Sequence, residues 1–204
     1  MEPLNSTQRR IHQAAVRLFA EKGVSQLNIS DLALEAGVAR GTIYNNVETM
    51  EQLFEQVAGQ LSADMHQRVK ACIESLDDPA QRLANGIRLF VRRTHEEPHW
   101  GAFMCRFALS DSSLREMFYS QAGADLLSGL SSGRYQFRQD QLVTVITLIA
   151  SAALGSMLLV REGLKTWRDA GADTAEMVLR SLGVSIVEAR ALSIVELPPL
   201  PPAG

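Results

Sequence analysis

The stretch Ile29-Ser-Asp-Leu-Ala-Leu-Glu-Ala-Gly-Val-Ala-Arg-Gly-Thr-Ile-Tyr-Asn-Asn-Val47 decides the fold that this sequence predicts. Its apolar residues recur at helical spacing in two short runs, which Gly37 separates. A glycine here allows the positive φ angle of a tight turn, and the small side chain of Ala33 lets two helices cross closely. The stretch therefore predicts two short helices that pack as a helix-turn-helix.

The second of these helices, residues 39–45, is expected to expose polar side chains that carry almost no charge. Arg40 is the only charged residue between Val38 and Val47, and hydroxyl and amide side chains surround it. Arginine can pair with guanine and asparagine with adenine, each through two hydrogen bonds, and threonine can bond a phosphate. Gly41 leaves space for DNA to approach the backbone. Because spacing, apolar pattern and polar face occur together, we prefer DNA contact over two merely solvated polar helices.

Capping residues delimit the helices around this stretch. Ser6 is expected to begin a helix that ends at Gly23, and Ser30 is expected to cap the first helix of the helix-turn-helix, whose terminal amides can face a phosphate. Thr49 is expected to cap a fourth helix, whose apolar stripe continues at helical spacing to Ile73. This helix would join the first helices to the rest of the chain without a flexible linker.

Residues 7–57 resemble the DNA-binding domain of the TetR family of repressors. The resemblance lies in the order and spacing of Ile29-Ser-Asp-Leu-Ala, Ala36-Gly-Val, Gly41-Thr-Ile-Tyr and the fourth-helix start at Thr49. It implies that residues 39–45 form a recognition helix in the major groove of DNA. With the positions argued above, the candidate DNA-binding residues are Asn28, Ser30, Ala39, Arg40, Gly41, Thr42, Tyr44, Asn45, Asn46 and Thr49.

Three positions depart from the pattern of this family. Val47 replaces a usual phenylalanine, Asn46 stands where histidine is common, and Met50 stands where a lysine commonly contacts a phosphate. Residues 1–60 contain five basic and seven acidic side chains, which gives a net charge of −2. We therefore expect a modest DNA affinity that depends less steeply on salt than that of a basic DNA-binding protein.

The rest of the chain also predicts helices and no β-strands, because no run alternates apolar and polar residues for long. Asp78 and Pro79 form a strong helix start, Pro98 ends that helix, and Asp111 caps a further one. Two long helices are expected over residues 140–163 and 173–195. The proline-rich tail that follows cannot continue a helix and is expected to be extended, with binding of a partner as the alternative.

The predicted fold is thus all-α, with about nine helices in total. Residues 1–50 are expected to form a three-helix helix-turn-helix domain for DNA binding. Residues 51–204 are expected to form a helical bundle for ligand binding and dimerisation, joined to the first domain by the continuous fourth helix.

The uncharged segment at residues 142–160 offers a surface for a second copy of the chain. Its small residues permit close helix approach, and the final helix adds a further apolar surface. We expect the last two long helices to form a homodimer, as the family resemblance also implies, and two heads would then bind a palindromic operator. A membrane span is the alternative for so long a segment, but its two threonines, two serines and glycine weaken that alternative.

The ligand-binding residues are less clearly marked. The middle helices carry aromatic and soft apolar side chains that could hold an apolar or aromatic small-molecule effector, with an ordinary core as the alternative. These residues are Phe90, Trp100, Phe103, Met104, Phe107, Phe118 and Tyr119. His95 and His99 are four residues apart, but Pro98 interrupts the helix that would align them, so we expect no metal site. No pattern of nucleophile and base is evident, so neither an enzyme nor a cofactor is expected.

Composition is compatible with these predictions. The chain is 46% hydrophobic and 21% charged, which is typical of a globular protein, and its net charge of −3 excludes a generally basic DNA binder. Two cysteines form no disulfide framework, and the polar N-terminus has no signal pattern, so a cytoplasmic protein is expected. The predicted function is a repressor that binds its operator as a homodimer and is released by a small molecule. The alternative is a helical small-molecule-binding module without DNA function.

Overall fold

The computed structural model of the chain describes residues 5–201 and is helical without strands over that range. The all-α prediction is confirmed, with ten α-helices in the described part of the chain. They are α1 Ser6–Lys22, α2 Ile29–Ala36, α3 Arg40–Tyr44, α4 Met50–Ile73, α5 Pro79–Glu96, α6 Pro98–Phe107, α7 Ser112–Ser131, α8 Leu142–Arg161, α9 Trp167–Ser181 and α10 Ile186–Ser193, with 3-10 turns at Val24–Gln26 and Gln139–Gln141.

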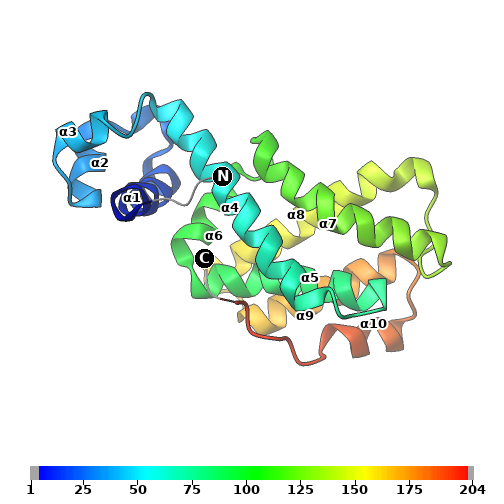
Figure 1. Cartoon of the computed structure of the whole chain (residues 1–204). Coiled ribbons are helices and arrows are strands. Elements are labelled where there is room, and N and C mark those ends of the chain that lie inside the picture. The colour runs from blue at the N-terminus through cyan, green and yellow to red at the C-terminus, as the bar shows by residue number, and fades with distance from the viewer. Residues whose placement is uncertain (1–4, 202–204) are drawn as a thin grey trace.

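Helices α1, α2 and α3 form an N-terminal unit, residues 5–49, which we call the head (Figure 1). Phe19 of α1, Leu32 of α2 and Ile43 of α3 are all fully buried, so the three helices share one apolar core. Gly37 has the positive φ angle that the sequence predicts, 62°, and it ends α2 in the left-handed conformation. The turn that separates α2 from α3 therefore depends on a residue without a side chain.

Two of the predicted helix caps are wrong. Asn5 caps α1 instead of Ser6, and Asn28 caps α2 instead of Ser30. In each case the asparagine side chain accepts a hydrogen bond from the backbone amide three positions later, at 2.9 and 3.0 Å, and the serine lies inside the helix. An extended asparagine just before the helix offers a better acceptor position than a helical serine. The other predicted caps are confirmed, namely Thr49, Asp78 and Asp111.

Helix α4 is continuous from Met50 to Ile73, as predicted, and leads from the head into the remainder of the molecule (Figure 1). It packs on α1 near its start and on α7 and α5 along its later turns. Leu53 and Val57 are buried near the head, and Met65 and Val69 are buried further along. A movement of α4 would therefore be transmitted to the head through a rigid element.

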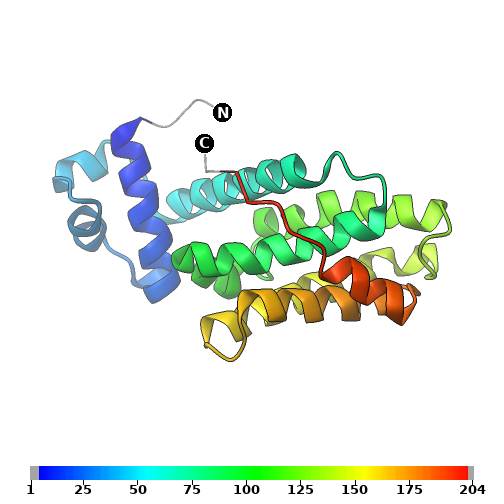
Figure 2. The same cartoon turned by 90° about the horizontal axis from the view of Figure 1, so that it is seen from below.

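Helices α5 to α10 form the body, and α5 lies in its middle with α4 on one side and α9 on the other (Figure 2). Helices α7 and α8 pack on each other and on α5, and α6 packs on α1 of the head. One buried apolar cluster runs from the head through α4 into α6, α7 and α8. The head and the body thus share a continuous core.

The predicted helix over residues 173–195 is wrong as a single element, and this break accounts for the tenth helix. Helix α9 begins earlier, at Trp167, and ends at Ser181. Gly183 then takes a φ angle of 93°, and Ser185 caps α10 by accepting a hydrogen bond from Glu188 N. A glycine with positive φ followed by a serine cap reverses the chain direction, so α10 folds back on α9.

Helix α8 has one buried and one exposed apolar face. Residues 139–161 are long and apolar enough to cross a membrane by length and composition, and they are the one such stretch within residues 5–201. Ile149 and Met157 of α8 are buried against the body, whereas Leu148 and Leu158 are exposed. The helix is thus part of the core on one side only.

Candidate DNA-binding surface and ligand cavity

The helix-turn-helix is held by contacts that the local sequence provides. Ile43 and Val47 are buried against the head, which points the other face of α3 outward. Arg10 of α1 donates a hydrogen bond to the carbonyl oxygen of Gly37 at 2.7 Å, so the turn between α2 and α3 is fixed to α1. These contacts place α3 rigidly on the surface of the head.

The predicted recognition helix is exposed where DNA contact requires it. The α-helix proper covers Arg40–Tyr44, one residue shorter at each end than predicted, and Ala39 is its N-cap residue. Tyr44 is 68% exposed, although it directly follows the fully buried Ile43. The other predicted contact residues of this segment are exposed or half-buried, namely Ala39, Arg40, Gly41, Thr42, Asn45 and Asn46.

Some predicted contact residues already have partners within the head. Asn46 donates a hydrogen bond from Nδ2 to Thr42 O at 2.8 Å, which extends the end of α3. Asn28 caps α2 through Oδ1 and also donates from Nδ2 to Asp31 Oδ2 at 3.1 Å. Thr49 Oγ1 accepts from Gln52 N at 3.1 Å at the start of α4. These three side chains thus form hydrogen bonds with the backbone of the head and of α4. Arg40 and Tyr44, in contrast, are exposed on the surface.

Aromatic rings form the joint between the head and the body. Phe54 of α4 contacts Phe19 of α1, with ring centroids 5.4 Å apart. The same ring contacts Phe103 and Phe107 of α6 at 5.5 and 4.9 Å. Arg106 adds a polar contact, because its Nη1 donates to the carbonyl oxygens of residues 20 and 21 at the end of α1. The head is therefore fixed to α6 as well as to α4.

Sequence reasoning missed a buried charge cluster at the same joint. Arg93 of α5 is 2% exposed, and its Nη2 lies 2.7 Å from Asp64 of α4 and 2.9 Å from Glu97. Arg68 of α4 donates to Glu97 at 2.8 Å, and the Arg93 guanidinium lies 4.4 Å from the centre of the Trp100 ring. The cluster ties α4 to the junction of α5 and α6. No local sequence pattern indicates this cluster, because Asp64 and Arg93 lie far apart in the sequence.

This cluster is expected to make stability fall at low pH. Burial alone would raise the pKa of Glu97, but the charge of Arg93 and the hydrogen bonds from Arg68 and Arg93 lower it below its ordinary value of 4.5. A carboxylate with a lowered pKa in the folded state stabilises the protein above its ordinary pKa, and that stabilisation is lost as the pH falls towards the lowered value. Melting temperature, measured from pH 7 to pH 3, should therefore drop below about pH 4.5.

A pair of variants tests this pH dependence. Glu97→Gln should lower the melting temperature at pH 7 and flatten its dependence on pH below 5, because glutamine has no proton to gain. Glu96→Gln changes a carboxylate on the same turn that pairs at 2.7 Å with Arg92, whose side chain is 19% exposed against 2% for Arg93, and it should leave the slope unchanged. Equal slopes for the unaltered protein and Glu97→Gln would contradict the expectation.

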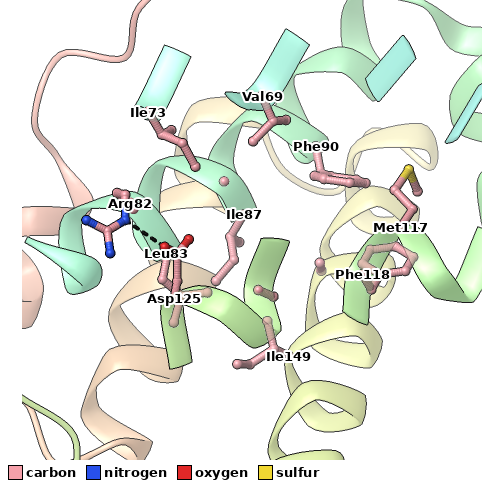
Figure 3. Close-up of a pocket in the computed structure, with 13 residues that line it drawn as sticks. Val69, Ile73, Arg82, Leu83, Ile87, Phe90, Met117, Phe118, Asp125 and Ile149 are labelled. Carbon is pink, nitrogen blue, oxygen red and sulfur yellow. Dashed lines mark hydrogen bonds and ion pairs between the residues drawn. The ribbon is translucent and has the colours of Figure 1, made fainter. Parts of the chain in front are cut away.

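The body contains a mostly apolar cavity of about 60 Å³ between α4, α5, α7 and α8 (Figure 3). One water needs about 15 Å³ on the same kind of measure and a cavity that binds benzene about 150 Å³, so this space corresponds to roughly four waters. At one end, Arg82 Nε lies 2.6 Å from Asp125 Oδ1, and that carboxylate is almost fully buried. Arg82 Nη1 also donates to the carbonyl oxygens of residues 76 and 77, which holds the guanidinium in place. The remaining lining residues are Val69, Ile73, Leu83, Gly86, Ile87, Phe90, Met117, Phe118, Ala122, Ile149 and Ala153.

The structure brings only two of the seven predicted ligand-binding residues to this cavity, Phe90 and Phe118, whose rings lie 5.1 Å apart. Phe103, Met104 and Phe107 belong to the core near the head, and Trp100 stacks with Arg93. Tyr119 is hydrogen-bonded to Thr147 Oγ1 at 3.1 Å. Sequence reasoning missed the aliphatic wall and the Arg82–Asp125 pair, since neither has a local signature.

Two family profiles match this chain. The profile described as bacterial regulatory proteins, tetR family, matches residues 11–57, which contain the helix-turn-helix. The profile of the tetracyclin repressor-like C-terminal domain matches residues 78–194, more than half of the chain. The chain belongs to the TetR family. The predicted family is thereby confirmed, and membership makes this TetR-family protein a DNA-binding transcriptional regulator and not an enzyme.

Curated relatives match over the N-terminal part. The fatty acid metabolism regulator protein of Bacillus subtilis is 38% identical over 65 residues, which is 30% of this chain and 34% of that protein. AcrR of Shigella flexneri is 37% identical over 51 residues, 25% of this chain and 24% of that protein. The chain thus matches about a quarter to a third of the length of these two relatives.

Solved structures of the family match along nearly the whole chain. RolR in complex with resorcinol is 28% identical with a TM-score of 0.73, and the match covers 96% of each chain. FadR from Bacillus subtilis in complex with stearoyl-CoA is 22% identical with a TM-score of 0.70, covering 87% of this chain and 99% of that one. At 22% identity, the match to FadR shows only that the two chains share a fold.

Proposed function

We propose that this chain is a ligand-responsive repressor that binds a palindromic operator as a homodimer and is released by a small molecule. Residues 1–50 would bind DNA in the cytoplasm, and residues 51–204 would bind the ligand and the second copy. The observation that carries the proposal is the path from surface to cavity: α3 exposes Arg40 and Tyr44, and α4 carries both the head and the cavity wall at Val69 and Ile73.

The exposed face of α8 is the proposed dimer interface, together with α9. Leu148 and Leu158 of α8 are 54% and 43% exposed, and Met177 of α9 is 68% exposed. Large apolar side chains gathered on one face of a soluble domain usually mark a contact with another molecule. A second copy would cover them by symmetric packing, and the two heads would then lie side by side to contact two half-sites.

The cavity favours a monocyclic aromatic ligand that carries a hydroxyl group. Its wall is aliphatic and aromatic, so an apolar ring that widens the cavity would gain close contacts with that wall. The Arg82–Asp125 pair at one end supplies a donor and an acceptor, which a phenolic hydroxyl can satisfy together. RolR, whose structure contains resorcinol, is a compatible precedent. A long acyl chain such as that of stearoyl-CoA exceeds about 60 Å³ by far.

The proposed release mechanism acts through α4. A ring that enters the cavity would contact Val69 and Ile73 and shift the later turns of α4 relative to α5. Phe54 and the charge cluster around Arg93 would transmit that shift to the head. In a dimer the spacing between the two recognition helices would change, so a ligand that prefers this state would lower DNA affinity.

Selection of bound fragments from random double-stranded DNA tests the proposal. A DNA-binding homodimer should enrich a palindrome with half-sites one helical turn or a multiple of it apart. Resorcinol and phenol should then release the selected fragment, whereas stearoyl-CoA should not. If no sequence were enriched while resorcinol still bound, the chain would be a small-molecule-binding module without DNA function.

A side chain that fills the cavity should weaken ligand binding and leave DNA binding unchanged. Gly86 of α5 lines the cavity, and a Cβ built on it meets no described atom within 4 Å. Gly86→Leu should therefore extend from an unobstructed Cβ into the ligand space and improve helix propensity by up to about 1 kcal/mol. We expect resorcinol affinity, measured by calorimetry, to fall at least about tenfold while the selected DNA is bound as before.

Gly59→Ala is the matched control for this variant. Gly59 lies in α4 outside the cavity, and its added Cβ also meets no described atom within 4 Å. It should raise the melting temperature without changing ligand affinity. Unchanged resorcinol binding by Gly86→Leu would place the ligand elsewhere in the molecule.

A further inference from the structure

The proline-rich tail is seated on the outside of the body. After α10 the chain runs back across α5 to α4 as an extended segment, residues 197–201, which we call the strap (Figure 2). Arg92 Nη1 of α5 donates to Pro198 O at 3.2 Å, and Cys72 Sγ of α4 donates to Pro199 O at 3.6 Å. Leu197 and Leu200 are partly buried against the main apolar cluster. The extended conformation expected from the sequence is therefore present over residues 197–201, and residues 202–204 of the predicted tail lie outside the described residues.

Its composition suits a segment that binds by few contacts. Proline fixes the φ angle, so the free segment has fewer conformations to lose when it docks. Proline also has no amide hydrogen, and a docked proline-rich segment therefore leaves few donors without partners. Two leucine side chains and two accepted hydrogen bonds can then hold the strap in place.

The strap joins the two helices whose inner faces line the cavity. Cys72 precedes the cavity residue Ile73 in α4, and Arg92 lies close after the cavity residue Phe90 in α5. Arg92 also directly precedes Arg93, the centre of the charge cluster that ties α4 to the head. An outward movement of α4 away from α5 would stretch or detach the strap.

We propose that the strap is a regulatory element that holds α4 against α5 in the ligand-free position. Docking of the strap stabilises the arrangement in which the heads bind DNA, so it opposes release by the ligand. Since the strap and the ligand act on the same helix in opposite directions, their effects are coupled by linkage. The part of this inference that concerns DNA depends on the proposed function, whereas the restraint on α4 does not.

Truncation after Glu196 is the test, and the Cys72 thiol reports directly on the docked strap. In a Cys105→Ser background, a maleimide should label Cys72 about fivefold faster in the truncated chain, because the strap no longer covers it. Hydrogen exchange over residues 61–73 of α4 should also become faster. Affinity for the selected DNA fragment should fall about fivefold, the lower end of typical coupling between sites.

Two further variants separate the strap from general effects of truncation. A chain that ends at Pro201 keeps the docked residues and should behave as the full chain does. Leu200→Ser keeps the length but removes an apolar contact, and it should shift labelling in the same direction as the truncation. Circular dichroism of each variant checks that the helices remain folded.

The outcomes distinguish this inference from the proposed function. Unchanged Cys72 labelling and unchanged exchange of α4 after truncation would overturn the strap as a restraint. Faster labelling with unchanged DNA affinity would overturn its regulatory role. If the full chain bound no DNA, the proposed function would fail, and the labelling and exchange data would still decide whether the strap holds α4.

Discussion

Replacement of Arg93 by methionine is expected to lower the free energy of unfolding by about 3 kcal/mol. Methionine has a similar length and can retain the apolar contacts, but it leaves the Asp64 and Glu97 carboxylates to share the cation of Arg68. The charge also loses its position over the Trp100 ring, 4.4 Å from the ring centre. Chemical denaturation at pH 7 measures the effect, which should be one of the largest of any single charge removal in this chain.

Arg180→Met is the control for this variant. Arg180 pairs with Glu176 one helical turn away on α9, and its side chain is 44% exposed. Surface pairs of this kind contribute less than about 1 kcal/mol, so the control should unfold almost as the unaltered protein does. Similar losses for both variants would mean that the buried cluster is not a special source of stability.

The double variant Asp64→Asn, Arg93→Met shows where the cost comes from. If the loss in Arg93→Met comes from the Asp64 carboxylate, neutralising it should restore part of the stability, while Glu97 keeps its hydrogen bond from Arg68 at 2.8 Å. No recovery of stability would assign the cost to the lost contacts of the Arg93 side chain itself.

The sequence predicted the head well because its signals are local. Helix spacing, Gly37 and the threonine at position 49 each act within a few residues, and the structure places α2, α3 and the start of α4 accordingly. The predicted caps Ser6 and Ser30 lie one and two positions after Asn5 and Asn28, which cap α1 and α2 in the structure. Such errors move a boundary but leave the packing unchanged.

The cavity and the charge cluster could not be predicted in this way. Arg93 lies in a segment rich in charged residues, and its burial depends on contacts with Asp64, 29 positions earlier, and with Glu97. Most of the predicted aromatic residues do not line the cavity. Phe103 and Phe107, for example, pack against Phe54 next to the head. Long-range packing decides which apolar residues surround empty space, and a single sequence does not encode that locally.

Replacement of Arg40 by alanine is expected to lower affinity for the selected operator by about tenfold or more, since one arginine-to-base pairing is worth about 1–3 kcal/mol and a dimer loses two. The folded state should be unaffected, because Arg40 is exposed on α3 and forms no ion pair among residues 5–201. Tyr44→Ala should act in the same direction, since a side chain that is 68% exposed contributes little to the core. Fluorescence anisotropy with labelled operator measures both changes.

The control is Arg138→Ala, which removes another exposed arginine, from the loop before α8 at the far end of the body from the head (Figure 1). It should bind operator as the unaltered protein does. A loss of affinity equal to that of Arg40→Ala would indicate a general effect of charge and would remove α3 from the candidate interface.

Arg40→Lys then decides what the arginine contacts. Lysine keeps the charge but cannot form the two parallel hydrogen bonds of a guanidinium with guanine. If Arg40 contacts a base, lysine should fail nearly as badly as alanine, and the preference at one operator position should relax. If Arg40 contacts a phosphate, lysine should retain most of the affinity, and only alanine should reduce the dependence on salt. Since Arg40 is the single charged residue of α3, and the first 60 residues have a net charge of −2, specificity in this head must come mainly from hydrogen bonds and shape.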